Sequence, residues 1–146
     1  GTDWKTASLA NHSGLSAASR ITPKQMNAVM TAALKGRYAG WDFASLLPVG
    51  GWGGALDGRF AGPATSGRVW AKTGTMHYAK GLTGLLFTKA GKRLAFAAYI
   101  TDFNRRKSYD ADPVRLAPHR QVAARAWIKR AESDMENLIG SWIDEH

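Results

Sequence analysis

The sequence predicts an α+β fold in which an antiparallel sheet is packed by a C-terminal helix. Three observations support this class: a capped apolar helix pattern after residue 22, three strand-like runs between residues 68 and 101, and a long amphipathic segment near the C-terminus. The chain has 146 residues, of which 45% are hydrophobic. This composition is globular, and the length is sufficient for one domain with a core of its own.

The first helix is expected to begin at Thr22. Its hydroxyl can cap the free backbone amides, and Pro23 suits the first helical position. The side chain of Gln25, the third helical residue, can reach back to the Thr22 amide and complete a capping box. Apolar side chains then recur at helical spacing, namely Met26, Val29, Met30, Ala33 and Leu34. The helix should end near Gly36.

A shorter helix is expected over residues 41–47, stopped by Pro48. Residues 48–67 contain seven glycines and two prolines, a composition too irregular for the interior of a helix or strand. Residues 1–67 therefore form a helix and loop portion, followed by a strand portion over residues 68–101.

Three runs in the strand portion are rich in β-branched, aromatic and aliphatic residues: 68–73, 81–88 and 93–101. Residues 89–92 predict a hairpin between the last two. Both alternating sets of side chains are apolar in residues 93–101, which is typical of a central strand covered on both faces.

Residues 102–118 contain two prolines and are expected to be a loop. A long helix should follow over residues 119–143, with a possible break at Ser133 and Asp134. Its apolar stripe comprises Val122, Ala126, Trp127, Ile128, Met135, Leu138, Ile139 and Trp142. We expect these tryptophans to pack on the sheet.

The net charge of +9 is unevenly distributed. Residues 132–146 hold five acidic and no basic side chains, so the first 131 residues carry 20 basic and 6 acidic side chains, a net charge of +14. Such a body favours polyanionic partners such as wall polymers or anionic lipid, although a solvated basic surface is the simpler reading of any one cluster.

Several classes of site have no support in the sequence. The chain has no cysteine, which excludes disulfides, thiol nucleophiles and zinc–thiolate centres. His12, His77, His119 and His146 show no paired metal-ligand spacing, and no nucleotide-binding glycine motif is present, so no metal or cofactor is expected. The longest apolar run, residues 94–100, is too short to span a bilayer, and no signal peptide is visible.

The segment Lys72-Thr73-Gly74-Thr75 carries the clearest chemical signal. On a strand it places an ammonium group, two hydroxyls and a glycine backbone without a side chain along one edge. Such an edge can bind a substrate carboxylate and stabilise a developing oxyanion. It also matches one of three motifs of penicillin-binding serine enzymes. The alternative is that Lys72 is an ordinary edge-strand lysine that discourages aggregation.

Four stretches, in order, resemble the D-alanyl-D-alanine carboxypeptidase/endopeptidase family, the low-molecular-mass class C penicillin-binding proteins. They are residues 11–16 with 20–23, residues 46–51 with 54–56 and 59–60, residues 69–75, and residues 81–84 with 91–96. The resemblance covers residues 1 to about 101. It implies a penicillin-binding-protein/serine β-lactamase-like transpeptidase domain, peptidoglycan stem peptides and β-lactams as ligands, and a periplasmic or secreted, cell-wall-associated location.

The resemblance also implies roles for single residues. Lys72 and Thr75 would be catalytic, with Lys72 supplying positive charge and the Thr75 backbone N–H donating to the oxyanion. Thr73, Gly74 and Thr75 would bind the substrate, with the two hydroxyls donating to its terminal carboxylate.

The family's Ser-x-x-Lys and Ser-x-Asn motifs are absent from residues 1–146. None of the nine serines has Lys three residues later or Asn two residues later. In the family both motifs precede the loop that matches residues 11–16. We therefore expect one partial domain, the C-terminal part of a longer peptidase, which is inactive without the N-terminal part.

Ser13 and Ser16 are then turn residues and not nucleophiles. The competing hypothesis is a non-catalytic basic module that binds a wall polymer or nucleic acid. No specific nucleic-acid motif supports the second ligand.

Overall fold

The computed structural model describes residues 1–145 and has the predicted α+β order. Its elements are α1 (Pro23–Ala33), β1 (Arg37–Tyr38), β2 (Trp41–Asp42), the 3-10 turns η1 (Phe43–Leu46) and η2 (Gly54–Leu56), β3 (Val69–Met76), β4 (Ala79–Phe87), β5 (Arg93–Thr101), α2 (Phe103–Ala111) and α3 (Pro118–Glu145).

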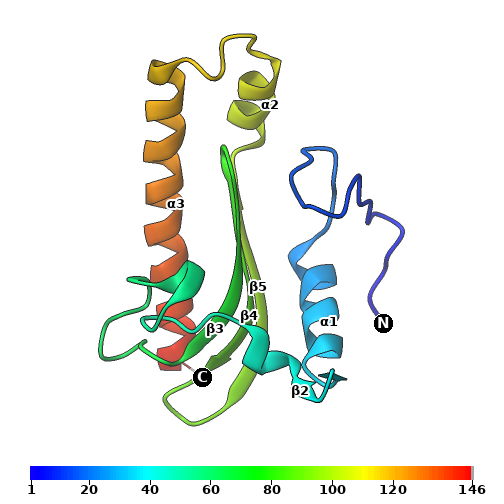
Figure 1. Cartoon of the computed structure of the whole chain (residues 1–146), viewed down its shortest axis with the longest axis vertical. Coiled ribbons are helices and arrows are strands. Elements are labelled where there is room, and N and C mark those ends of the chain that lie inside the picture. Colours follow the sequence, from blue (N-terminus) through cyan, green and yellow to red (C-terminus); the bar gives the residue numbers. More distant parts are fainter. Residues whose placement is uncertain (146) are drawn as a thin grey trace.

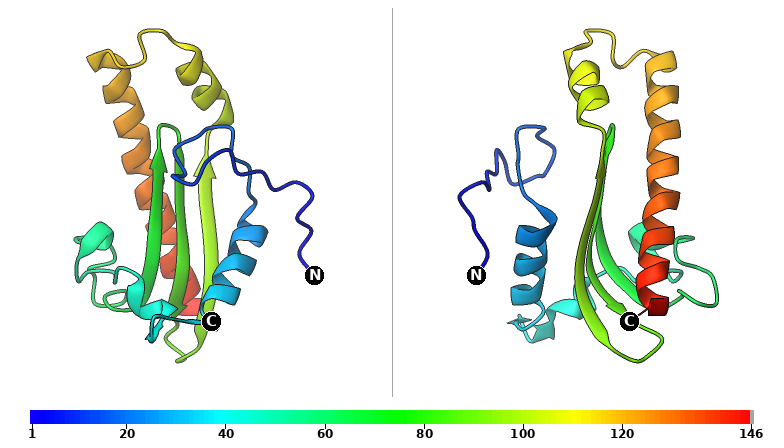
Figure 2. Two further views of the ribbon diagram at one scale, coloured as in Figure 1. Left: turned by 45° about the vertical axis from the view of Figure 1, so that its right-hand side comes forward. Right: turned by 180° about the vertical axis from the view of Figure 1, so that it is seen from behind.

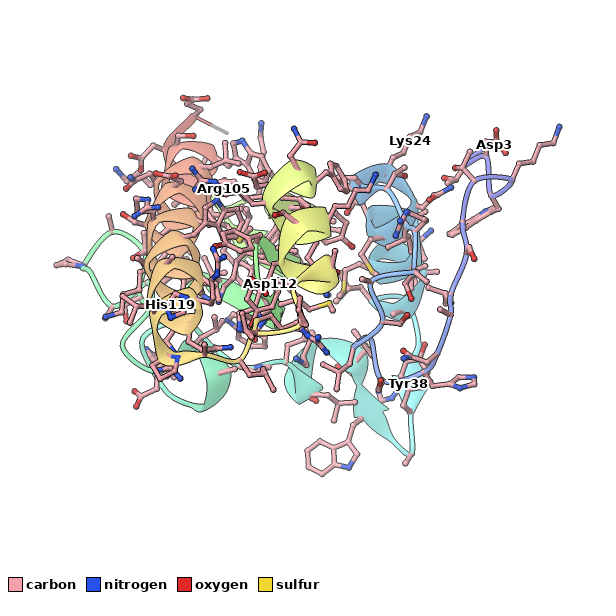
Figure 3. All side chains as sticks on the ribbon, turned by 90° about the horizontal axis from the view of Figure 1, so that it is seen from above. Asp3, Lys24, Tyr38, Arg105, Asp112 and His119 are labelled. Atoms are coloured by element: carbon pink, nitrogen blue, oxygen red, sulfur yellow. The ribbon has the colours of Figure 1, made fainter. Side chains whose placement is uncertain are left out.

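The main sheet is antiparallel, with strand order β3-β4-β5. Helix α1 covers one face and α3 covers the other, so the molecule has three layers (Figures 1 and 2). Seen from above, α2 lies between α1 and α3 at the end of the sheet (Figure 3). The packed C-terminal helix predicted from the sequence is confirmed.

The main core lies between the sheet and α3. Side chains alternate between the faces of a strand, so Val69, Ala71 and Leu82 point to the same side and are fully buried there. From α3 they meet Met135, Ile139 and Ile143. Burial of each large aliphatic side chain contributes about 1.5–3 kcal/mol.

The predicted stripe of the last helix is only partly correct. Met135 and Ile139 are buried as expected, but Val122 and Leu138 are exposed, and the buried set also includes Ala124, Ala131 and Ile143. Helix α3 has no break at Ser133 and Asp134. Its small buried alanines carry little hydrophobic signal, which explains why the sequence pattern placed the stripe imperfectly.

The start of α1 is confirmed in detail. Thr22 Oγ1 accepts from the Gln25 amide at 3.2 Å, and Gln25 Oε1 accepts from the Thr22 amide at 2.9 Å, which completes a capping box. Gln25 is buried and its Nε2 also donates to Asp3 O at 2.7 Å. The cap therefore also ties the N-terminal segment to the helix.

Two expectations about local structure were only partly correct. The helical segment expected over residues 41–47 is limited to the 3-10 helix η1, because Ala39 and Gly40 both adopt positive φ and turn the chain into the β1–β2 hairpin just before it. Residues 102–118 are not all loop, because the Asp102 carboxylate accepts from the Arg105 amide and begins α2. That helix buries little besides Tyr109, so it has no apolar stripe.

The strands differ in extent and position from the prediction. β3 continues beyond residue 73 to Met76, and β4 begins at Ala79 after a turn formed by His77 and Tyr78. The hairpin after β4 is confirmed. β5 is covered on both faces as expected, and within residues 1–145 it pairs only with β4, so it is an edge strand of the described part and not a central one.

Candidate active site

The edge of β3 that faces away from β4 is paired with another backbone segment along its first half, and within residues 1–145 its second half has no such partner. The Gly50 amide donates to Val69 O at 2.7 Å, and the Ala71 amide donates to Pro48 O at 2.9 Å. The segment around Val49 therefore acts as a short fourth strand, bridged to Trp70. The backbone groups of Val69 and Ala71 consequently point away from β4.

The second half of this edge belongs to Thr73 and Thr75. The register of β3 with β4 is uninterrupted, and every second residue of an antiparallel strand directs its N–H and C=O to the same side. Thr73 and Thr75 therefore share the outward orientation of Ala71, beyond the reach of the segment at Val49. Their amides and carbonyls can pair with an added extended chain.

The side chains of the motif lie on both faces of the strand. Lys72 and Gly74 project from the α1 face, and Thr73 and Thr75 from the α3 face. The Lys72 side chain is exposed, and its Nζ donates to Thr73 O at 2.6 Å on the open edge. A Cβ added to Gly74 would meet no atom within 4 Å, so the α1 face of the strand is open at this position.

A partly buried group of charged side chains lies behind Thr75 and was missed by the sequence analysis. Lys80 on β4 donates to Thr75 Oγ1 at 2.8 Å and forms an ion pair with Glu132 on α3. Arg59 lies 3.3 Å from Glu132 Oε1 and donates through Nε to Glu136 Oε1 at 2.6 Å. We call Arg59, Lys80, Glu132 and Glu136 the charge cluster.

The one sequence feature that could have revealed part of the charge cluster is the turn between β3 and β4. A two-residue turn at His77 and Tyr78 fixes Lys80 as the register partner of Thr75. Neither residue is a strong hairpin turn former, and Tyr78 is forced to φ +58°. The sequence therefore did not predict this turn, and without the turn the pairing of Thr75 with Lys80 could not be predicted.

His77 belongs to a second polar group at the same end of β3. Its ring stacks on Tyr109 of α2 with centroids 4.4 Å apart, and Gln121 Nε2 donates to the Tyr109 hydroxyl at 2.7 Å. Arg106 donates to His77 O at 3.0 Å. These contacts hold α2 and α3 at the tip of the β3–β4 hairpin, where a pocket of about 370 Å³ opens beside Thr75.

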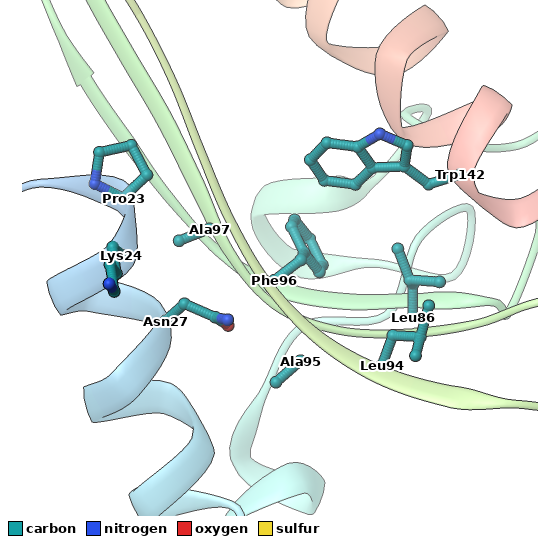
Figure 4. Close-up of a pocket in the computed structure, with 9 residues that line it drawn as sticks. All are labelled: Pro23, Lys24, Asn27, Leu86, Leu94, Ala95, Phe96, Ala97 and Trp142. Atoms are coloured by element: carbon teal, nitrogen blue, oxygen red, sulfur yellow. The ribbon is translucent and has the colours of Figure 1, made fainter. Parts of the chain in front are cut away.

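Another pocket, of about 440 Å³, lies at the opposite edge of the sheet. Its walls come from α1, β5 and α3, and include Asn27, Phe96 and Trp142 (Figure 4). Lys24 is the one charged residue among the side chains that line it. The pocket lies on β5 and not on β3, and it contains no nucleophile or acid–base pair.

The remaining candidate residues are structural. Ser13 Oγ accepts from the Leu15 amide at 3.3 Å and Ser16 Oγ from the Ala18 amide at 3.2 Å, so both serines stabilise turns. Within residues 1–145 no group of three His, Asp or Glu side chains could hold a metal; His146 lies outside the described residues. No helix of the described part is long and apolar enough to cross a membrane.

The model of the D-Ala-D-Ala carboxypeptidase 3 (S13) family matches residues 1–117. The chain belongs to this family. It is 34% identical over 102 residues to carboxypeptidase DacB of Mycolicibacterium smegmatis, and 36% identical over 105 residues to carboxypeptidase Rv3627c of Mycobacterium tuberculosis. These alignments cover 66% and 65% of this chain, and 22% of each relative. The chain therefore spans about a fifth of the curated relatives it matches.

Solved structures confirm the fold of a penicillin-binding-protein domain. Penicillin-binding protein 4 of Haemophilus influenzae superposes with a TM-score of 0.61 at 25% identity, over 84% of this chain and 28% of that protein. The penicillin-G-acylated predatory endopeptidase Bd3459 of Bdellovibrio bacteriovorus superposes with a TM-score of 0.58, at the same identity and coverage. The family and fold inferred from the four sequence stretches are thereby confirmed.

Proposed function

We propose that residues 1–146 form the Lys-Thr-Gly wall of the active site of a serine-type D-Ala-D-Ala carboxypeptidase/endopeptidase that acts on peptidoglycan. The observation that carries the proposal is the open second half of β3, where Thr73 and Thr75 direct their backbone groups outward beside exposed Lys72. Membership of the D-Ala-D-Ala carboxypeptidase family supports this assignment.

The reaction is acyl transfer. A serine hydroxyl attacks the carbonyl between two D-alanines, its proton passes to the leaving amine, and the terminal D-alanine departs; water then releases the acyl group from the serine. The Thr75 amide donates to the oxyanion that forms on the attacked carbonyl. Lys72 supplies positive charge beside the terminal carboxylate, which the hydroxyls of Thr73 and Thr75 also bind.

The attacking serine belongs to the part of the protein that precedes residue 1, together with the Ser-x-x-Lys and Ser-x-Asn motifs. In this proposal the chain is the C-terminal part of one catalytic domain, made of a helix and loop portion (1–67), strands (68–101) and a final helix (119–143). The much greater length of the curated relatives supports it. The N-terminal part docks on the side of β3 that α1 leaves open.

In this proposal the substrates are peptidoglycan stem peptides, β-lactams act as their mimics, and the protein works in the periplasm or outside the cell at the wall. Two neighbours support the β-lactam assignment: the Haemophilus protein in complex with a β-lactam, and the Bdellovibrio endopeptidase acylated by penicillin G. No cofactor takes part in this chemistry.

A fluorescent β-lactam tests the proposal. The full-length protein should form a covalent adduct that survives denaturation, whereas residues 1–146 alone should form none. Peptide mapping should place the adduct on a serine before residue 1. A full-length protein that lacks Ser-x-x-Lys, or that never becomes labelled, would contradict the enzymatic proposal.

The alternative of a polyanion-binding module rests on the basic body of the chain. The cluster Arg105-Arg106-Lys107 gives it limited support, because Arg105 pairs with Asp102 at 3.5 Å and Arg106 with Asp110 at 2.7 Å. Binding to a wall polymer would weaken steeply as salt rises. Acylation without such binding favours the peptidase.

A further inference from the structure

The contact between Lys80 and Thr75 restricts what the Thr75 hydroxyl can do. An ammonium group has three hydrogen-bond donors and no acceptor, so Thr75 Oγ1 must accept in its 2.8 Å bond with Lys80 Nζ. A hydroxyl carries only one proton. The O–H of Thr75 therefore points away from Lys80 and is available to an acceptor elsewhere.

Lys80 is itself firmly held. It is only 6% exposed, and its ammonium group is paired with Glu132 on α3. Glu132 also faces Arg59, whose side chain is 12% exposed and which is bound in turn to Glu136. The charge cluster thus contains two cations and two carboxylates, which compensates the burial of Lys80.

Burial makes the direction of this bond persistent. An exposed lysine samples many rotamers, whereas Lys80 is fixed between β3, β4 and α3 by packing and by two polar partners. Thr75 itself remains exposed at the open edge of β3. The arrangement joins a rigid donor behind the strand to a hydroxyl that solvent or a ligand can reach.

We propose that Lys80, fixed by Glu132, is a positioning residue that orients the Thr75 hydroxyl as a hydrogen-bond donor to the terminal carboxylate of the substrate. This inference rests on the proposed function. Lys80 touches no substrate in this arrangement. It acts by occupying a lone pair of Thr75 Oγ1, so that the proton is already directed outward when a carboxylate arrives.

The test compares two peptides in the full-length protein: one ends in D-Ala-D-Ala with a free carboxylate, and the other carries the same sequence with a terminal amide. Lys80→Met should lower kcat/KM for the free acid about 10-fold, as expected for a lost hydrogen bond to a charged group. The same variant should change kcat/KM for the amide by less than about 2-fold. Thr75→Val should show the same selectivity. The double variant should be no worse than Thr75→Val alone, because both changes remove one interaction.

Lys89→Met is the matched control. Lys89 also pairs with an acidic residue of α3, Asp144, at 2.8 Å, but both side chains are more than half exposed and lie away from Thr75. This variant should leave kcat/KM unchanged for both peptides. If Lys80→Met does not fold, the isosteric Glu132→Gln, which loosens Lys80 but keeps an acceptor oxygen, should give a smaller loss with the same preference for the free acid.

The outcomes separate the two proposals. Equal losses for acid and amide, or independent losses for Lys80→Met and Thr75→Val, would show that Lys80 only supports the fold and would overturn the inference while the peptidase assignment stands. A full-length protein with neither acylation nor hydrolysis overturns the proposed function, and this inference with it.

Discussion

Gly84 on β4 lies directly opposite Ala71 on β3, and the two strands leave no room there for a second side chain. A Cβ added to Gly84 would overlap the Trp70 carbonyl oxygen and lie 2.6 Å from Ala71 Cα. Both obstacles are backbone atoms, which cannot rotate away. The core between the sheet and α3 therefore depends on a glycine at this position.

Gly84→Ala should destabilise the protein by about 3 kcal/mol, the upper range for overpacking a core. The free energy of unfolding is obtained from urea titrations followed by circular dichroism. Gly74→Ala is the matched control, because its new Cβ would meet nothing within 4 Å, and it should change stability by less than about 0.5 kcal/mol. Equal effects of the two alanines would contradict the close approach of β3 and β4.

Thr22→Ala should destabilise the protein by about 1 kcal/mol, because it removes the side-chain acceptor from the capping box of α1. Thr31→Ala tests the same replacement at an exposed position inside that helix. Alanine is the better helix former, so this control should be neutral or slightly stabilising. Thermal unfolding of both variants distinguishes a cap from a general effect of threonine.

Lys72→Met should lower acylation of the full-length protein by a β-lactam about 100-fold or more, comparable to the loss of one group that stabilises the oxyanion. The side chain is exposed, so the unfolding midpoint should stay the same. Lys35→Met provides the control, since Lys35 is also exposed but lies at the end of α1, away from β3. A Lys72 variant that acylates normally would support the alternative of an ordinary edge lysine.

Burial raises the pKa of Tyr99 on β5. Because the folded-state pKa exceeds the unfolded value of about 10, the neutral hydroxyl contributes stability that is complete below pH 10 and is lost as the pH rises through the folded pKa. Unfolding titrations at pH 8 to 11 should show this loss, and Tyr99→Phe should reduce it. A pH dependence identical in the variant would mean that Tyr99 ionises without penalty.

The parts of the fold that the sequence could predict are those with strong local signals. The capping box at Thr22 and Gln25, the apolar runs of β4 and β5, and the length of α3 each follow from short-range patterns. The hairpin at residues 37–42 and helix α2 were missed. The first depends on a positive φ at Ala39, and the second on polar residues whose cap became visible only in three dimensions.

The same distinction applies to the candidate site. Lys72, Thr73, Gly74 and Thr75 could be selected because their residue types suit one chemistry. Lys80 and Glu132 could not, because Glu132 reaches the strand from a helix more than 50 residues later, and the ion pair exists only once α3 has packed on β4.

The three main strands follow one another directly, joined by a turn of two residues and another of five. A sheet built from such near neighbours has low contact order, and low contact order favours rapid folding. Helix α1 reaches the same sheet from the other end of the sequence and must close a long loop to do so. The hairpin contacts within the sheet are therefore expected to form faster than the contacts that α1 makes with it.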